Sequence, residues 1–133
     1  MSVLTTADAD RRAIARGLLE ASSPVVVALC AAWCDTCNEF RAAFERMALA
    51  RPGMLFVWLD IEDDSFVCGD IDIENFPTLA IYRGDTLLHF GVSLPQEGTV
   101  ARLIDEMGVR ASGTDDAPKA VLDLAQTFKR YVG

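Results

Sequence analysis

The sequence predicts an α/β fold in which a central mixed β-sheet of about four strands is flanked by helices, with an extra helix at the C-terminus. Apolar runs of strand length alternate with longer segments whose apolar residues recur every three or four positions, a pattern typical of α/β proteins. Two further extended segments, 78–83 and 86–90, flank Gly84 and Asp85. Gly-Asp between two extended segments favours a hairpin turn and therefore an antiparallel strand pair.

The N-terminal half is expected to form a helix, a strand, a second helix and a second strand. A helix over 5–20 precedes the continuous apolar run 25–31, which predicts a central strand covered on both faces. A helix over 34–50 follows, and 54–61 predicts the second buried strand. The apolar stripe of the second helix includes Cys37, so we expect Cys37 to be buried against the sheet.

The C-terminal half is expected to end in two helices. Segment 62–76 is irregular or briefly helical, and 95–107 predicts a helix with an apolar inner face. Residues 1–108 form the expected domain, and 109–117 have the Gly, Ser, Thr and Asp content of a linker. Residues 118–133 predict an amphipathic helix, packed on the domain or placed at an interface. Packing on the domain is favoured because such a stripe is usually part of a core.

Charge and hydropathy narrow the classes of partner. With 20 acidic and 12 basic residues the net charge is −8, which disfavours binding to nucleic acid or to anionic membrane surfaces. The longest apolar runs fall short of the roughly 18 residues that a membrane-spanning helix needs. Asp8 and Asp10 lie where a signal peptide would need its apolar centre, which predicts a cytoplasmic protein.

Two cysteines three residues apart begin the second helix, in the run Trp33-Cys34-Asp35-Thr36-Cys37. Positions three apart share a helix face, so their sulfurs can meet and form a disulfide. The first cysteine lies at the helix N-terminus, where unpaired N–H groups and the helix dipole favour a thiolate. Because the thiolate is the nucleophile in disulfide exchange, Cys34 is expected to attack and Cys37 to resolve.

The chain resembles the thioredoxin family over roughly residues 5–107. Four pieces match in order and spacing: the apolar strand leading into Trp33-Cys34-x-x-Cys37, the strand ending Leu59-Asp60-Ile61, the segment Phe76-Pro77-Thr78-Leu79, and Gly91-Val92. Trp-Cys-x-x-Cys followed downstream by Phe-Pro-Thr is fairly specific as a combination, whereas either piece alone is weak.

The resemblance implies a substrate groove around the two cysteines. Pro77 corresponds to the family's cis-proline, with an ordinary trans turn proline as the alternative. The backbone of Phe76 would then pair with an extended substrate segment as an added strand. The substrate-binding residues implied in this way are Trp33, Asp35, Thr36, Phe76, Pro77 and Gly91.

Several positions depart from the family pattern. Ala28 occupies the place of the buried aspartate that serves the second cysteine as proton shuttle, so release of Cys37 as a nucleophile is expected to be slower. Asp35 and Glu39 add negative charge that disfavours a Cys34 thiolate. Asp60 could substitute as the proton acceptor, or could simply cap the segment that follows it, which is the commoner role of such an aspartate.

The remaining cysteines and the histidine have structural interpretations. Cys30 is expected to be a buried strand residue that packs as a small hydrophobe. An iron–sulfur cluster on Cys30, Cys34 and Cys37, or a zinc site that adds Cys68, is disfavoured because the chain lacks the other elements of either site. Cys68 is expected to pack, with a regulatory thiol as the alternative. His89 is expected to be exposed on a strand.

The predicted function is protein-disulfide reduction or exchange in cell redox homeostasis, through the Cys34/Cys37 dithiol and without a bound cofactor or metal. The expected partners are disulfide-containing client proteins and a thiol reductase or small-thiol electron donor. A monomer is expected, with a dimer through the C-terminal helix as the alternative. Two other functions stay open: a binding or assembly module with a vestigial or regulatory cysteine pair, and a reductase dedicated to one client.

Overall fold

The described part of the chain forms a mixed four-stranded sheet between two layers of helices, in a computed structural model. The residues described are 3–4, 8–19, 24–31, 33–62, 64, 77–84, 86–92, 96–109 and 113–132. The strands are β1 (Pro24–Cys30), β2 (Leu55–Asp60), β3 (Thr78–Arg83) and β4 (Thr86–Val92). The helices are α1 (Asp8–Leu19), α2 (Asp35–Ala50), α4 (Glu97–Met107), α5 (Lys119–Leu122) and α6 (Leu124–Val132). This architecture confirms the predicted fold class.

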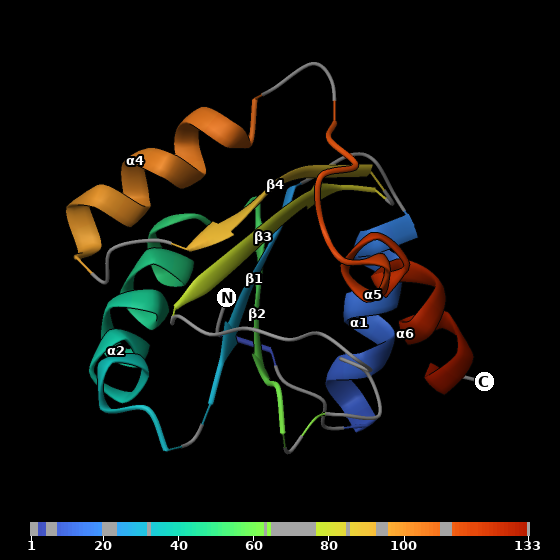
Figure 1. The fold of residues 1–133 in the computed structure, drawn as a ribbon, viewed down its shortest axis with the longest axis horizontal. Helices are drawn as coiled ribbons and strands as arrows, with labels where there is room; N and C mark the ends of the chain where they lie inside the picture. Colours follow the sequence, from blue (N-terminus) through green and yellow to red (C-terminus); the bar gives the residue numbers. More distant parts are fainter. Residues whose placement is uncertain are drawn as a thin grey trace.

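The sheet has the strand order β2-β1-β3-β4. β1 pairs in parallel with β2 and antiparallel with β3, and β3 forms an antiparallel hairpin with β4. Gly84 lies in the turn of that hairpin with a φ of 61°, a left-handed conformation that glycine adopts without steric cost. α2 and α4 cover one face of the sheet, and α1, α5 and α6 cover the other (Figure 1).

Alternation along the strands explains the two layers of core. In β1, Val25, Val27 and Leu29 face the α1/α6 layer, whereas the residues between them face the α2/α4 layer. The same alternation holds in β2 and β3, because successive side chains of a strand point to opposite faces. The continuous apolar run of β1 therefore reflects burial on both faces, as its sequence predicted.

Aromatic side chains bind α2 to the sheet. Phe44 of α2 lies edge-on to Phe56 and Trp58 of β2, with ring centroids 5.2 and 5.7 Å apart. The guanidinium of Arg41 lies 4.9 Å from the Trp58 ring centroid, in cation–π geometry. These contacts hold the N-terminal turn of α2, which carries the cysteines, at a defined position on the sheet.

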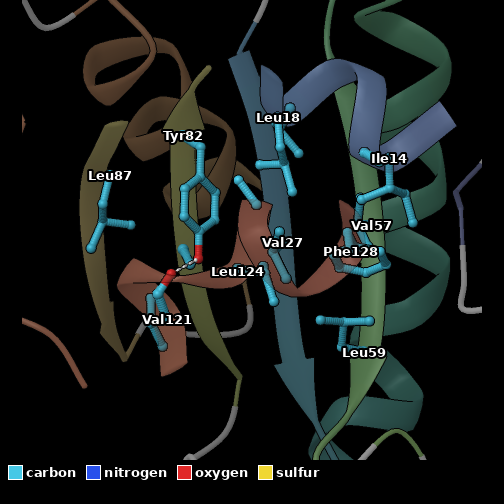
Figure 2. Packing of buried hydrophobic residues seen from close by; sticks show 14 of the residues in the cluster. Ile14, Leu18, Val27, Val57, Leu59, Tyr82, Leu87, Val121, Leu124 and Phe128 are labelled. Atoms are coloured by element: carbon cyan, nitrogen blue, oxygen red, sulfur yellow. Dashed lines mark hydrogen bonds between the residues drawn. The ribbon is translucent and has the colours of Figure 1, made fainter. Parts of the chain in front are cut away.

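The C-terminal segment packs on the α1 side of the sheet, as Figure 2 shows. Val121, Leu124 and Phe128 are each at most 1% exposed there. The hydroxyl of Tyr82 donates a hydrogen bond to the carbonyl of Val121 over 2.9 Å. The segment is not the single helix that the sequence predicted: it is interrupted at Asp123, and Pro118 precedes the first helical turn instead of occupying it.

A short pairing near the N-terminus was not predicted. Leu4 forms an isolated parallel bridge with Val57 on β2, with its N–H donating to the Phe56 carbonyl over 2.8 Å. The expected irregular segment 62–76 falls mostly outside the described residues, and the boundaries proposed at 108 and 117 stay a prediction. None of the helices described is long and apolar enough to cross a membrane.

Candidate redox site

The candidate residues gather at one end of the sheet, where β1 and β2 finish and β3 begins. Leu29 of β1 pairs with Thr78 of β3, and Thr78 pairs in turn with Val92 at the end of β4. β1 ends close to this row and leads into the cysteine motif. β3 begins at this row, directly after Pro77. The crossover from β1 to α2 therefore places the cysteines beside the segment that carries Pro77.

Cys34 is the N-cap residue of α2, in an extended conformation with φ −89° and ψ 111°. Its sulfur accepts a hydrogen bond from the N–H of Cys37 over 3.4 Å, and its own N–H donates to the Ala31 carbonyl over 3.0 Å. The sulfur is only half-buried, and the thiol is free. The Cys37 N–H is therefore a hydrogen-bond donor next to a sulfur that an approaching molecule can reach.

Cys37 lies one turn into α2 and is fully buried, as the helical stripe predicted. Its disulfide partner, however, is Cys30, the last residue of β1, with the two Cα atoms 6.0 Å apart. The disulfide expected from the sequence, between Cys34 and Cys37, is therefore not the one formed in this structure. The interpretation of Cys30 as a simple packing residue is also wrong, although its burial is as expected.

Strand and helix geometry explain this pairing. Cys30 points to the same face of the sheet as Val26 and Ala28, which is the face that α2 covers. The buried stripe of α2 presents Cys37 to that face, while Cys34 caps the helix nearer to solvent. The sequence signal was present in the Cys-x3-Cys-x2-Cys spacing, but spacing alone does not say which two of the three sulfurs meet.

Trp33, the residue before Cys34, is exposed. Its ring is 64% exposed, and its indole N–H donates to a carboxylate oxygen of Glu62 over 2.8 Å. This hydrogen bond links the motif to the turn that follows β2. Asp35 and Thr36, the two residues between the cysteines of the motif, are exposed in the first turn of α2. All three are open to an approaching molecule on the surface around Cys34.

The other predicted groove residues come from β3 and β4. Pro77 is buried immediately before β3, and Gly91 is half-buried in β4, paired with Leu79. Phe76 lies outside the described residues, and the cis bond expected at Pro77 stays a prediction. Val92 follows Gly91 and is 58% exposed, so a second exposed apolar side chain besides Trp33 lies at this end of the sheet. Val92 belongs to the matching piece Gly91-Val92 but was not among the predicted groove residues.

Asp60 lies at the end of β2, opposite Cys30 in the parallel register. One of its carboxylate oxygens accepts the N–H of Glu62 over 2.8 Å, which is the capping role expected of it. Residues paired across neighbouring strands project to the same face, so Asp60 and Cys30 lie on the α2 side of the sheet together. The role of Asp60 as proton acceptor stays a prediction.

The structure shows where the residues that depart from the family pattern lie. Ala28 is fully buried in the core on the α2 side of the sheet, so this position supplies no carboxylate beneath the cysteines. Glu39 is exposed on α2 and adds, with Asp35, to the negative charge of the helix N-terminal turn. Like charges close to a sulfur oppose formation of its thiolate, and the helix N-terminus favours it.

His89 and Cys68 are the remaining residues that the sequence singled out. His89 is half-buried in β4, opposite Ile81, and not exposed as the sequence predicted. Cys68 lies outside the described residues. Across the ranges that the structure describes, no three His, Cys, Asp or Glu side chains are grouped so as to hold a metal ion.

A mixed sheet whose first strand leads into a cysteine-capped helix defines the class of thioredoxin-fold proteins with redox-active thiols. Comparison with known proteins gives the family: the thioredoxin family model matches residues 5–104. The chain belongs to the thioredoxin family. Family membership and the bonded cysteine pair together support thiol–disulfide redox chemistry in general terms.

Individual relatives are distant. The chain is 28% identical to thioredoxin from Ophiophagus hannah over 68 residues, which cover 51% of this chain and 65% of that protein. It is 30% identical to sulfhydryl oxidase 1 from Rattus norvegicus over 115 residues, 78% of this chain but only 15% of the oxidase. The aligned part of the chain therefore spans less than two thirds of either relative.

Solved structures of the same fold include thioredoxins from a plant and a parasite. Thioredoxin NaTrxh from Nicotiana alata superposes with a TM-score of 0.67 at 16% identity, covering 80% of this chain and 93% of the other. The oxidised thioredoxin from Plasmodium falciparum gives a TM-score of 0.63 at 19% identity, covering 81% of this chain and all of the other. At such identities the similarity establishes the fold alone.

Proposed function

We propose that the protein is a thiol–disulfide oxidoreductase that reduces or exchanges disulfides of client proteins, with Cys34 as the attacking thiolate and Cys37 as the resolving thiol. The observation that carries the proposal is the position of Cys34, half-exposed at the N-cap of α2 with the Cys37 N–H donating to its sulfur. A sulfur in this position can be reached by a client disulfide and has a hydrogen-bond donor next to it.

The reaction starts from the fully reduced domain. The Cys34 thiolate attacks one sulfur of a client disulfide, a mixed disulfide forms, and the other client sulfur leaves as a thiolate. The Cys37 thiolate then attacks the sulfur of Cys34, which breaks the mixed disulfide and releases the second client thiol. Two electrons pass from the domain to the client, and a Cys34–Cys37 disulfide results. A thiol reductase or a small thiol restores the dithiol, so no bound cofactor is required.

The surface around Cys34 supports binding of an extended client segment. Trp33 and Val92 have exposed apolar side chains at this end of the sheet. Pro77 directly precedes β3 at the same end. A client chain that lies along Phe76 and Gly91 would pair as an added strand, with Asp35 and Thr36 contacting the residues beside the client disulfide. Asp60, which pairs with Cys30 in the sheet register, is the proton acceptor of this proposal.

Partner and location follow from the same features. Disulfide-containing clients and a thiol-based electron donor are the partners that the chemistry needs. The stripe of α6 is already covered by the rest of the chain, which supports a monomer over a dimer through that helix. A net charge of −8 supports the absence of nucleic-acid or membrane partners, and a reducing compartment such as the cytoplasm would keep Cys34 available.

Insulin reduction driven by dithiothreitol tests the proposal. We expect turnover by the wild type, and Cys34→Ser to reduce it to the uncatalysed rate because the attacking sulfur is gone. The matched control is Ala42→Ser, which places the same serine on an exposed position of the same helix and should leave turnover unchanged. Equal rates for the wild type and Cys34→Ser would contradict the proposal.

A second function of a different class is a binding or assembly module with a vestigial or regulatory cysteine pair. The burial of Ala28 where the family places a carboxylate, and the exposed acids Asp35 and Glu39, favour this alternative. A module of this kind would show no insulin turnover with or without Cys34. A reductase dedicated to one client would turn over little insulin, yet Cys37→Ser would still trap that client as a mixed disulfide through Cys34.

A further inference from the structure

Cys37 has two sulfur-bearing neighbours in this structure. Its sulfur is bonded to Cys30, and its backbone N–H donates to the sulfur of Cys34 over 3.4 Å. The two neighbours approach from different directions, because Cys30 ends β1 in the sheet and Cys34 caps α2. The sulfur of Cys30 and the sulfur of Cys34 therefore both lie next to Cys37.

Cys30 and Cys37 are both placed for a stable bond in the interior. Cys30 is 1% exposed and Cys37 is fully buried, and their Cα separation of 6.0 Å lies in the usual range for disulfides. Cys34 remains half-buried with a free thiol. With the Cys30–Cys37 bond formed, Cys34 is thus still available as a thiol.

We propose that Cys30 is a third redox thiol, which takes over Cys37 from Cys34 after each round of client reduction; this deepens the proposed function and rests on it. The thiolate of Cys30 attacks the sulfur of Cys37 in the Cys34–Cys37 disulfide. The bond between Cys37 and Cys30 forms, the bond between Cys37 and Cys34 breaks, and Cys34 leaves as a thiolate. Cys30 gives up its proton before the attack, and the departing Cys34 thiolate takes up a proton from solvent. One disulfide replaces another, so no electrons are gained or lost overall.

The chemistry of the three thiols favours this direction. Exchange proceeds towards expulsion of the thiolate that is the better leaving group. Cys34 has the helix N-terminus and the Cys37 N–H to stabilise its thiolate, whereas a thiolate on Cys30 would be desolvated in the core. Asp60, paired with Cys30 in the sheet register, is the group placed to receive the Cys30 proton.

The exchange gives the oxidised domain a property that a two-cysteine site lacks. With two cysteines, oxidation consumes the attacking thiol. With Cys30 as the final partner of Cys37, the disulfide of the oxidised domain lies in the core and Cys34 is again a thiol. Cys34 of the oxidised domain can then form a mixed disulfide that Cys37 cannot resolve until the buried bond is reduced.

The wild type itself provides the first test. The protein is oxidised with one equivalent of diamide, which leaves no glutathione adduct on Cys34, freed of reagent, alkylated natively with iodoacetamide, then denatured, reduced and labelled with N-ethylmaleimide. All three thiols fall in the tryptic peptide 17–41, so fragment ions that separate positions 30, 34 and 37 must assign the labels. We expect the first label on Cys34 and the second on Cys30 and Cys37. A second label on Cys34 and Cys37 would overturn the proposal.

Cys30→Ala provides the second test, with Val26→Ala as the matched control because Val26 is a fully buried residue on the same face of β1. In Cys30→Ala the oxidised protein should lose native alkylation of Cys34, because Cys34 and Cys37 are then the only partners in the site. If the Cys30–Cys37 bond is favoured about ten-fold in the wild type, removal of Cys30 raises the redox midpoint by about 30 mV. An unchanged midpoint, or one shifted equally by the control, would overturn the proposal.

The outcomes distinguish failure of the proposed role of Cys30 from failure of the proposed function on which it rests. Insulin turnover combined with a Cys34–Cys37 bond in the oxidised wild type overturns the role of Cys30 and leaves the reductase standing. A Cys30–Cys37 bond that opens and closes with the glutathione ratio, without insulin turnover and without a client trapped by Cys37→Ser, supports Cys30 as a redox thiol and overturns the proposed reduction of client disulfides. Because the mapping uses the wild type, a folding defect in Cys30→Ala would not remove the test.

Discussion

At the scale of single residues, the buried hydroxyl of Tyr82 shows how one polar atom joins distant parts of the chain. Tyr82 is 1% exposed in β3, and its hydroxyl reaches the carbonyl of Val121 in α5 over 2.9 Å (Figure 2). The ring fills the core on the α1 side while the hydroxyl satisfies a backbone acceptor near a helix end. A buried polar atom needs such a partner, since leaving it unpaired costs free energy.

Tyr82→Phe tests this contact. The substitution keeps the ring and removes only the donor, so the free energy of unfolding should fall by about 1 kcal/mol, the usual contribution of one hydrogen bond. Urea denaturation followed by circular dichroism measures the difference. Tyr82→Leu, which also removes ring contacts, should cost more. An unchanged midpoint in Tyr82→Phe would mean that the hydrogen bond adds nothing to stability.

At the scale of elements, two ion pairs connect α2 to α4, the two helices that cover the same face of the sheet. Arg51 at the C-cap of α2 contacts both carboxylate oxygens of Asp105 at 2.9 and 3.0 Å, and Arg46 reaches Glu97 at 2.7 Å. The Arg51 guanidinium holds the pKa of the Asp105 carboxyl below its ordinary value, chiefly through these hydrogen bonds. The pairs are largely exposed, so solvent weakens them.

Asp105→Asn should lower the free energy of unfolding at neutral pH by less than about 1 kcal/mol. The pKa of Asp105 is lower in the folded state than in the unfolded state. The stabilisation by this ion pair is therefore complete at pH values above about 4, the ordinary carboxyl pKa, and disappears as the pH falls through the folded-state pKa. Urea denaturation of the wild type and the variant between neutral and acid pH measures this. The control is Glu106→Gln, an exposed acid on the same turn. A difference that grows towards acid pH would contradict the assignment.

At the scale of the whole molecule, the C-terminal helices complete the core on the α1 side. Phe128 of α6 is fully buried together with Ile14 and Leu18 of α1 (Figure 2). Without α5 and α6, these α1 side chains and the face of the sheet around Val27 would lose much of their cover. The last helix therefore contributes to the stability of the entire domain, while the redox site lies at the end of the sheet where β1 and β2 finish.

Phe128→Ala should cost about 3–5 kcal/mol, the range for removal of a buried phenylalanine ring. We expect the whole domain to be destabilised in one transition, seen as coincident urea curves by circular dichroism and by tryptophan fluorescence. Gln126→Ala, on the exposed side of the same helix, should change little. Separate transitions by the two probes, with the fluorescence midpoint unchanged, would mean that α6 unfolds independently.

The parts of this protein that sequence predicted are those encoded in local spacing. The apolar run of β1, the stripe of α2 that buries Cys37, and the turn at Gly84 each depend on residues a few positions apart. The site position was predicted for the same reason, because the helix N-terminus and Cys34 are adjacent in the chain. The bridge of Leu4 to β2 was missed, since a single paired residue leaves no periodic pattern.

The sequence by itself determined the fold class, the family resemblance and the burial of Cys37, because strand alternation, helix periodicity and the Trp33–Cys37 motif are all local patterns. Only the tertiary structure decided that Cys37 bonds to Cys30, that Asp60 lies beside Cys30, and that α6 packs on α1. These outcomes depend on how the helices dock on the two faces of the sheet. Residues far apart along the chain meet through that docking, and chain spacing alone does not specify it.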